Sequence, residues 1–226
     1  MTTPLRRAAA LATITAAALL AGCASPPKPY DYTTFKQSKP ASLLVLPPVN
    51  DSPDVKATYS VLAQVTLPLA EAGYYVLPVT LVDETFRQNG MTTPNDIHAV
   101  DPRRLHEVFG ADAAVYIKVK RYGSTYAVVA SDTTVAVEAK IVDLHNGALL
   151  WEGSASASSS ENNSSSQGGL VGLLVKALVE QILSSATDAS HNIAGVANAR
   201  LFSPQRVNGI LYGPRSPNYG KPAAKP

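Results

Sequence analysis

The chain has 226 residues and nearly balanced charges, with 19 Lys and Arg against 17 Asp and Glu. Arg6 and Arg7 precede an apolar leader, so the rest of the chain carries 17 residues of each sign. This balance argues against nucleic acid as a partner and against a basic membrane-binding surface. Cys23 is the only cysteine, so no disulfide can form within the chain and stability must come from burial.

Residues 1–22 are expected to be an export signal. Arg6 and Arg7 are followed by apolar and small residues from Ala8 to Leu20, and small residues precede Cys23. That order is typical of a cleaved signal. The segment is too short and too rich in alanine to remain in a bilayer, since a permanent helix needs about 20 strongly apolar residues. The alternative interpretation is a buried cysteine in an apolar helix.

Leu20-Ala21-Gly22-Cys23 resembles the lipobox of bacterial lipoproteins. The resemblance implies that Cys23 becomes the first mature residue and carries diacylglycerol on sulfur and an acyl chain, such as palmitate, on nitrogen. Each buried methylene contributes about 0.8 kcal/mol, so several chains form a stable membrane anchor. Ala24 and Ser25 follow, with no aspartate at the second mature position, which by resemblance to Gram-negative lipoproteins implies the outer membrane. We expect the domain to face the periplasm, although the residues leave an exterior orientation open.

Residues 23–41 are proline-rich and are expected to form a flexible tether ahead of an α/β domain over residues 42–202. The domain opens with an apolar run at 42–46, typical of a strand buried on both faces. A helical pattern over 55–72 and a short strand over 74–78 complete a strand–helix–strand unit, which favours a parallel right-handed crossover. Pro68 is expected to kink the last turn of the helix or end it early, and Gly73 to stop it.

Further elements follow this unit. Helices are expected over 81–88 and after Asp101-Pro102, an N-cap acid followed by proline at the first helical position. Alternating residues predict a strand over 112–122, a turn at Gly123-Ser124 and a long strand region over 125–143. A bulge or bend is expected at Ser131-Asp132. Asn146-Gly147 predicts a hairpin that returns through Leu149–Trp151. The fold class is therefore α/β: a single three-layer-like domain, with a mixed sheet flanked by helices.

The segment over 158–169 is rich in Ser and Asn and is expected to be a mobile loop, whereas residues 170–185 predict a helix that is apolar around most of its circumference. One sheet face cannot cover so wide an apolar surface. We therefore expect the helix to contribute both to the core and to a homodimer interface. Candidate interface residues are Val171, Leu174, Val175 and Leu178. A more polar helical continuation is expected to reach about Arg200, and a Pro- and Gly-rich tail to occupy 203–226.

No catalytic or metal-binding motif stands out. The four histidines, His98, His106, His145 and His191, are predicted on four separate elements without metal-ligand spacing. His98 is expected on a surface turn. The sequence contains no Gly-x-Ser-x-Gly elbow, and Gly168-Gly169 lacks the remaining features of a phosphate-binding loop. We therefore expect no enzyme activity, no cofactor and no metal site.

Three segments carry a resemblance that covers residues 42–219. They are Leu67–Val76, Leu211–Pro214 and the lipobox, and together they resemble a bacterial lipoprotein family of unknown function that includes a neisserial surface-antigen candidate. The hairpin region Val142–Trp151 resembles, over a shorter span, envelope lipoproteins that include the curli-secretion lipoprotein. The family implies an α/β sandwich-like domain, an outer-membrane location and a tendency to dimerise, and it supplies no catalytic residues.

Two functions of different classes follow. The first is a non-enzymatic outer-membrane lipoprotein that acts through protein contacts in envelope assembly, transport or secretion, with other envelope lipoproteins or secretion components as partners. The second is a periplasmic regulator or ligand-binding module, for instance an activator of cell-wall synthesis. A specific co-purifying partner would favour the first function, and a saturable small-molecule or glycan ligand the second.

Overall fold

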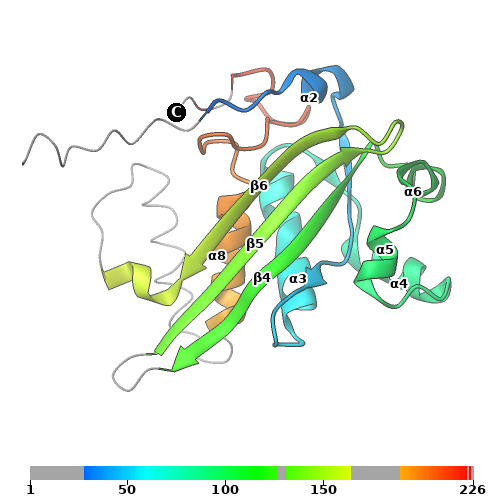
Figure 1. Cartoon of the computed structure of the whole chain (residues 1–226). Coiled ribbons are helices and arrows are strands. Elements are labelled where there is room, and N and C mark those ends of the chain that lie inside the picture. Colours follow the sequence, from blue (N-terminus) through cyan, green and yellow to red (C-terminus); the bar gives the residue numbers. More distant parts are fainter. Residues whose placement is uncertain (1–27, 127–130, 164–188, 223, 225–226) are drawn as a thin grey trace, which may run out of the picture. The chain divides into compact units, whose positions relative to one another are not determined.

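The computed structural model describes residues 28–126, 131–163, 189–222 and 224 (Figure 1). The described residues from Tyr30 onward belong to one compact unit. Cys23 and the helix predicted over 170–185 lie outside the described residues.

The parallel strand–helix–strand unit at the start of the domain is confirmed. Strands β1 (Ser42–Val45) and β3 (Tyr75–Val76) pair in parallel, and α3 (Ala57–Glu71) connects them. Gly73 ends the helix with φ at +99°, and a Cβ at this position would lie 2.5 Å from the backbone nitrogen of Ser216. Both the conformation and the close approach of the tail therefore require glycine.

Pro68 does not end α3 early, so that alternative of the sequence prediction is wrong. The helix continues to Glu71, and the Pro68 carbonyl accepts the Ala72 N–H at 3.0 Å. Val65 and Leu69, before and after the proline, are both fully buried. Packing of these two side chains outweighs the one helical hydrogen bond that proline cannot donate.

Three short helices follow β3: α4 (Val79–Gln88), α5 (Pro94–His98) and α6 (Pro102–Phe109). The Asp101 side chain accepts a first-turn backbone N–H of α6, as its N-cap position predicts. Gly110 closes the helix in the left-handed conformation, with φ at 66°.

Strands β4 (Ala113–Tyr126), β5 (Ser131–Asp143) and β6 (Leu149–Ser158) form an antiparallel meander. The strand order is β3-β1-β4-β5-β6 in a six-stranded sheet, and β2 (Val49–Asn50) pairs with β4. Because β1 and β2 pair with β4 in parallel and β5 pairs with it antiparallel, the predicted mixed α/β sheet is confirmed.

Two local predictions in this meander are wrong. Gly123-Ser124 makes no turn, since β4 stays paired with β5 out to Tyr126. Register shifts lie between Val119 and Arg121 of β4 and between Ile141 and Val142 of β5, rather than at Ser131-Asp132. At the shift in β4, the Lys120 side chain forms an ion pair with Asp51 at 2.8 Å. Asp51 is distant from Lys120 in the sequence, so no local pattern predicts this contact.

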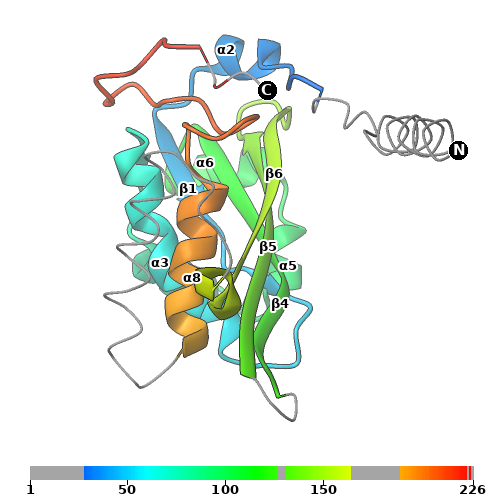
Figure 2. The ribbon, with the colours of Figure 1, turned by 90° about the vertical axis from the view of Figure 1, so that its left-hand side faces the viewer.

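Helices cover both faces of the sheet. On one face α3 lies beside α8 (Ala189–Leu201), the continuation that the sequence predicts up to about residue 200 (Figure 2). On the other face α4, α5 and α6 pack over β1 and the start of β4 through Phe86, Ile97 and Leu105. They do not cover the β5–β6 half of that face, where charged side chains of these strands lie exposed.

The folded unit extends beyond the predicted 42–202 domain at both ends. Helix α2 (Thr33–Ser38) buries Phe35 in the main core, so the part of the predicted tether from Tyr30 onward is folded. In the tail, Ile210 is buried and the Leu211 carbonyl accepts the Tyr74 hydroxyl at 2.6 Å. A short 3-10 helix, η1 (Ser159–Asn163), follows β6 where the sequence predicts a loop. Aromatic and aliphatic side chains such as Phe35 and Ile210 therefore anchor both proline-rich segments to the domain.

Candidate functional site

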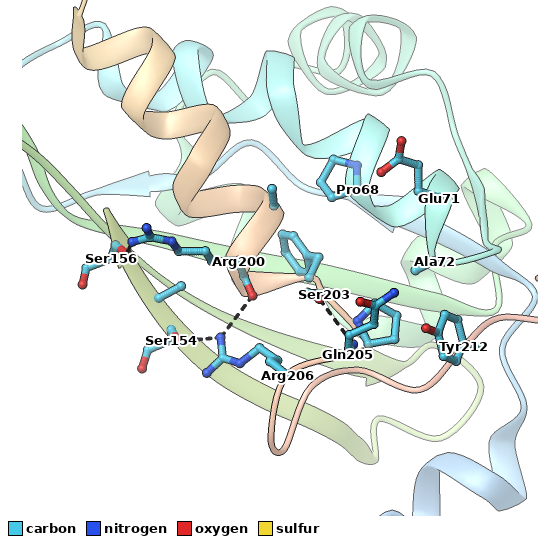
Figure 3. Close-up of a pocket in the computed structure, with 14 residues that line it drawn as sticks. Pro68, Glu71, Ala72, Ser154, Ser156, Arg200, Ser203, Gln205, Arg206 and Tyr212 are labelled. Carbon is cyan, nitrogen blue, oxygen red and sulfur yellow. Dashed lines mark hydrogen bonds between the residues drawn. The ribbon is translucent and has the colours of Figure 1, made fainter. Parts of the chain in front are cut away.

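A hollow of about 680 Å³ opens where the ends of α3 and α8 meet β6 (Figure 3). Apolar side chains form much of its lining, and two arginines lie in it. The lining residues are Pro68, Glu71, Ala72, Ser154, Ala155, Ser156, Ala199, Arg200, Phe202, Ser203, Pro204, Gln205, Arg206 and Tyr212.

Arg200 and Arg206 both reach to the backbone of β6. Arg200 Nη1 donates to the Ser156 carbonyl at 2.8 Å, and Arg206 Nη1 donates to the Ser154 carbonyl at 2.9 Å. Arg206 Nη1 also donates to the carbonyl of Arg200 at 3.3 Å. Arg200 forms an ion pair with Glu161 at 2.6 Å. No acidic side chain of the described chain lies within ion-pair distance of Arg206.

Burial lowers the pKa of the Arg206 guanidinium, and the nearby Tyr32 phenol opposes this shift. Arginine nevertheless remains charged at neutral pH, because its ordinary pKa is above 12. Tyr32 stays neutral, since burial raises the pKa of its hydroxyl to about 12. Arg206 is therefore a partly buried cation at the rim of an apolar hollow.

A second hollow, of about 690 Å³, lies on the open face of β4, β5 and β6. Arg206 and Ser154 line both hollows, whereas Lys118, Glu138 and Lys140 line only this one. The two hollows therefore lie at the same stretch of β6, the first on the face of the sheet that carries α3 and α8 and the second on the opposite face.

His98 lines the second hollow and is not on a surface turn, contrary to the sequence prediction. Its Nε2 donates to the Pro47 carbonyl at 2.9 Å, and its ring meets Tyr116 edge-on at 5.2 Å. Burial lowers the pKa of His98 to about 4. His98 is therefore neutral at pH 7 and unsuited to proton transfer near neutrality.

Two other polar pairs escaped the sequence analysis. The rings of His106 and His145 lie 4.2 Å apart, because the β5–β6 hairpin meets α6. Ser60 Oγ lies 2.8 Å from His191 Nδ1. Only 8% of Ser60 is exposed, and its hydroxyl also accepts the Tyr122 hydroxyl, so the pair links α3, α8 and β4 in the core. Neither pair has a local sequence signal, since each joins elements far apart in the chain.

Within residues 28–126, 131–163, 189–222 and 224, no group of three or more His, Cys, Asp or Glu side chains is arranged to hold a metal ion. No helix in these ranges is long and apolar enough to cross a membrane.

The predicted site residues lie elsewhere. Cys23 and the candidate interface residues Val171, Leu174, Val175 and Leu178 lie outside the described residues. Sequence reasoning in turn missed the two arginines at β6. Their only sequence signal is that both follow the last apolar helix pattern, which does not show what they contact.

Comparison with known proteins identifies similar chains. Residues 30–215 match the family model described as "Putative lipoprotein GNA1162-like". "Putative lipoprotein NMB1124/NMB1162" of Neisseria meningitidis serogroup B is 54% identical over 186 residues, which is 82% of this chain and 86% of that protein. The crystal structure of lipoprotein GNA1162 from N. meningitidis has 55% identity and a TM-score of 0.53, and the match covers 65% of this chain and all of that one. A PelC dodecamer structure from Paraburkholderia phytofirmans matches at 14% identity over 76% of this chain and 90% of that chain, with a TM-score of 0.44, too low to bear on function.

Proposed function

Because the chain belongs to the GNA1162-like family of lipoproteins, we propose that it is an outer-membrane lipoprotein that acts through protein contacts in envelope assembly, transport or secretion. In this proposal Cys23 carries the lipid anchor, and the compact unit that begins at Tyr30 faces the periplasm. The protein has no catalytic role.

The observation that carries the proposal is the position of the lipobox. Leu20–Cys23 ends a typical export signal, and the family match begins at residue 30, a few residues beyond the cysteine. The domain therefore follows the anchor closely and would be held near the lipid surface. Envelope partners in the same membrane are then met at high local concentration, which favours weak protein contacts.

The surroundings of His98 and Ser60 support a non-enzymatic role. His98 is neutral at pH 7 because it is buried, and Ser60 lies in the core with its hydroxyl engaged by Tyr122. These are the properties of groups that hold elements together, whereas a catalytic nucleophile needs access to its substrate.

The proposal is tested by cross-linking in intact cells, followed by purification of the chain from native membranes. We expect one or a few envelope proteins to be cross-linked to the wild type. The same proteins should be lost or strongly reduced with Cys23→Ser, which keeps the domain but removes the anchor. Equal recovery of partners with both variants would contradict an anchored role.

The hollow in Figure 3 favours a second candidate function, a periplasmic regulatory or ligand-binding lipoprotein, for example an activator of cell-wall synthesis. Its volume of about 680 Å³ is in the range of small-molecule sites. A saturable rise in melting temperature with cell-wall fragments or small glycans would favour this function over protein contacts.

A further inference from the structure

Strand β6 is an edge of the sheet within the described chain. It pairs with β5 on one side, and no other described strand pairs with it. An edge strand presents unpaired backbone groups that can bind another extended chain. In an antiparallel pair, every second residue directs both its N–H and its C=O away from the partner strand.

Ser154 and Ser156 are two residues apart on this edge, and their carbonyls accept the two arginine side chains at 2.9 and 2.8 Å. This is the spacing at which a neighbouring strand would place its own N–H donors. The guanidinium groups of Arg206 and Arg200 therefore occupy the positions of the missing strand's donors. Both bonds are exposed to solvent, so exchanging them for other donors costs little desolvation.

The two hollows lie on the two faces of this edge. Successive side chains of a strand point to opposite faces, so a strand added beside β6 would direct alternate side chains into the two hollows. On the helix side they would meet the apolar wall that includes Phe202 and Pro204. On the open side they would meet the charged surface with Lys140 and Glu138.

Charge gives the chemistry of the occupant. Glu161 neutralises Arg200, whereas no described acidic side chain pairs with Arg206. Within the described chain, the hydrogen bonds that Arg206 donates all come from Nη1. The N–H groups on its Nε and Nη2 atoms are therefore still available as donors. A guanidinium with donors to spare matches a carboxylate in geometry and in charge.

We propose that the β6 edge docks an extended segment of a partner protein, which adds as a strand and places an acidic side chain on Arg206. Backbone N–H groups of the segment replace the arginine donors at Ser154 and Ser156. The released Arg206 guanidinium then pairs with the carboxylate of the segment. This inference rests on the proposed function, since it names the kind of partner surface through which protein contacts are made.

The test uses the full chain in detergent and a positional-scanning library of fluorescent nonapeptides with glutamate fixed at the centre. The library is N-acetylated and C-amidated, and a matched library carries glutamine at the centre. Fluorescence anisotropy measures binding, and hydrogen–deuterium exchange reports protection of residues 149–158. We expect the glutamate library to bind more tightly and to slow exchange along β6.

Arg206→Gln removes the charge but keeps an N–H donor for the Ser154 carbonyl. It should weaken binding of the best glutamate peptide about tenfold, the effect of losing one charge-assisted hydrogen bond. Binding of the glutamine peptide should change little. Arg215→Gln is the matched control, since it removes an arginine that stacks on Tyr75 at the opposite sheet edge, and it should bind both peptides like the wild type. Methylation of every second backbone nitrogen of the best peptide, in the set that would face β6, should abolish binding.

Other results overturn the inference. These are no binding by either library, equal binding of the two libraries, an equal loss with Arg206→Gln and Arg215→Gln, or protection outside β6. Such results would leave the anchored role intact if Cys23-dependent cross-linking persists. Conversely, peptide binding at β6 without Cys23-dependent partners would refute the proposed function and retain the edge site.

Discussion

Trp151→Ala gives a direct test of how the sheet, α8 and the tail are joined. The Trp151 side chain is fully buried, its ring lies 6.2 Å from that of Phe202, and Nε1 donates to the Asn208 carbonyl at 3.0 Å. The indole also lies over Gly153, where a Cβ would come within 2.5 Å of the ring. The ring therefore fills a space bounded by three segments of the chain.

Truncation of a buried aromatic side chain to alanine costs about 3–5 kcal/mol, including the cavity that remains. At about 2–4 °C per kcal/mol for a chain of this size, the melting temperature should fall by about 6–20 °C. Trp151→Phe keeps most apolar contacts and loses the Asn208 hydrogen bond, so it should cost only about 1–2 kcal/mol. Thermal unfolding followed by circular dichroism measures all three proteins. A shift within error for Trp151→Ala would refute the assigned core position.

Two further predictions concern titration and assembly. Burial disfavours the charged ring of His98 and lowers its pKa from the ordinary 6.5 to about 4 in the folded chain. Between these two pH values the unfolded chain therefore binds a proton at His98 that the folded chain does not bind. The free energy of unfolding should consequently fall as the pH drops from 6.5 to 4. His98→Gln should make the urea midpoint less dependent on pH between 7 and 4.5, and an unchanged dependence would contradict the burial of His98. The interface prediction is tested in a chain lacking residues 1–23 with the single variants Val171→Glu, Leu174→Glu, Val175→Glu and Leu178→Glu. The parent should be a dimer by light scattering. At least one variant should be monomeric and still folded by circular dichroism, because an unpaired charge is costly in an interface. A monomeric parent at tens of micromolar, or unfolding of every variant, would show that the helix belongs to the core alone.

Features with a local physical cause could be predicted from the sequence. Asp101-Pro102 with Gly110 fixes both ends of α6 through cap chemistry that involves only nearby residues. The alternation of apolar and polar residues over 135–141 predicts the buried face of β5, because successive side chains of a strand point to opposite faces. Asn146-Gly147 likewise gives the hairpin from its own conformational preference, and Gly147 has φ at 77°.

Features decided by distant contacts could not be predicted. Pro68 stays helical because Val65 and Leu69 are buried beneath other elements, and Gly123 stays in a strand because Thr134 pairs with it. The contacts of the candidate site likewise join residues that are distant in the sequence. Arg206 meets Ser154 only because the loop after α8 returns to the sheet edge, 52 residues from its partner. Neither residue has a neighbour in sequence that signals the contact.

The central claim, a lipid-anchored envelope protein, is tested most directly by fatty-acid labelling of Cys23. Cells that express the wild type or Cys23→Ser are grown with radioactive palmitate, and their membranes are then separated by density. The wild type should be labelled and fractionate with the outer membrane, whereas Cys23→Ser should be unlabelled and either uncleaved or released from that fraction. Equal labelling and the same membrane location for both proteins would contradict the account.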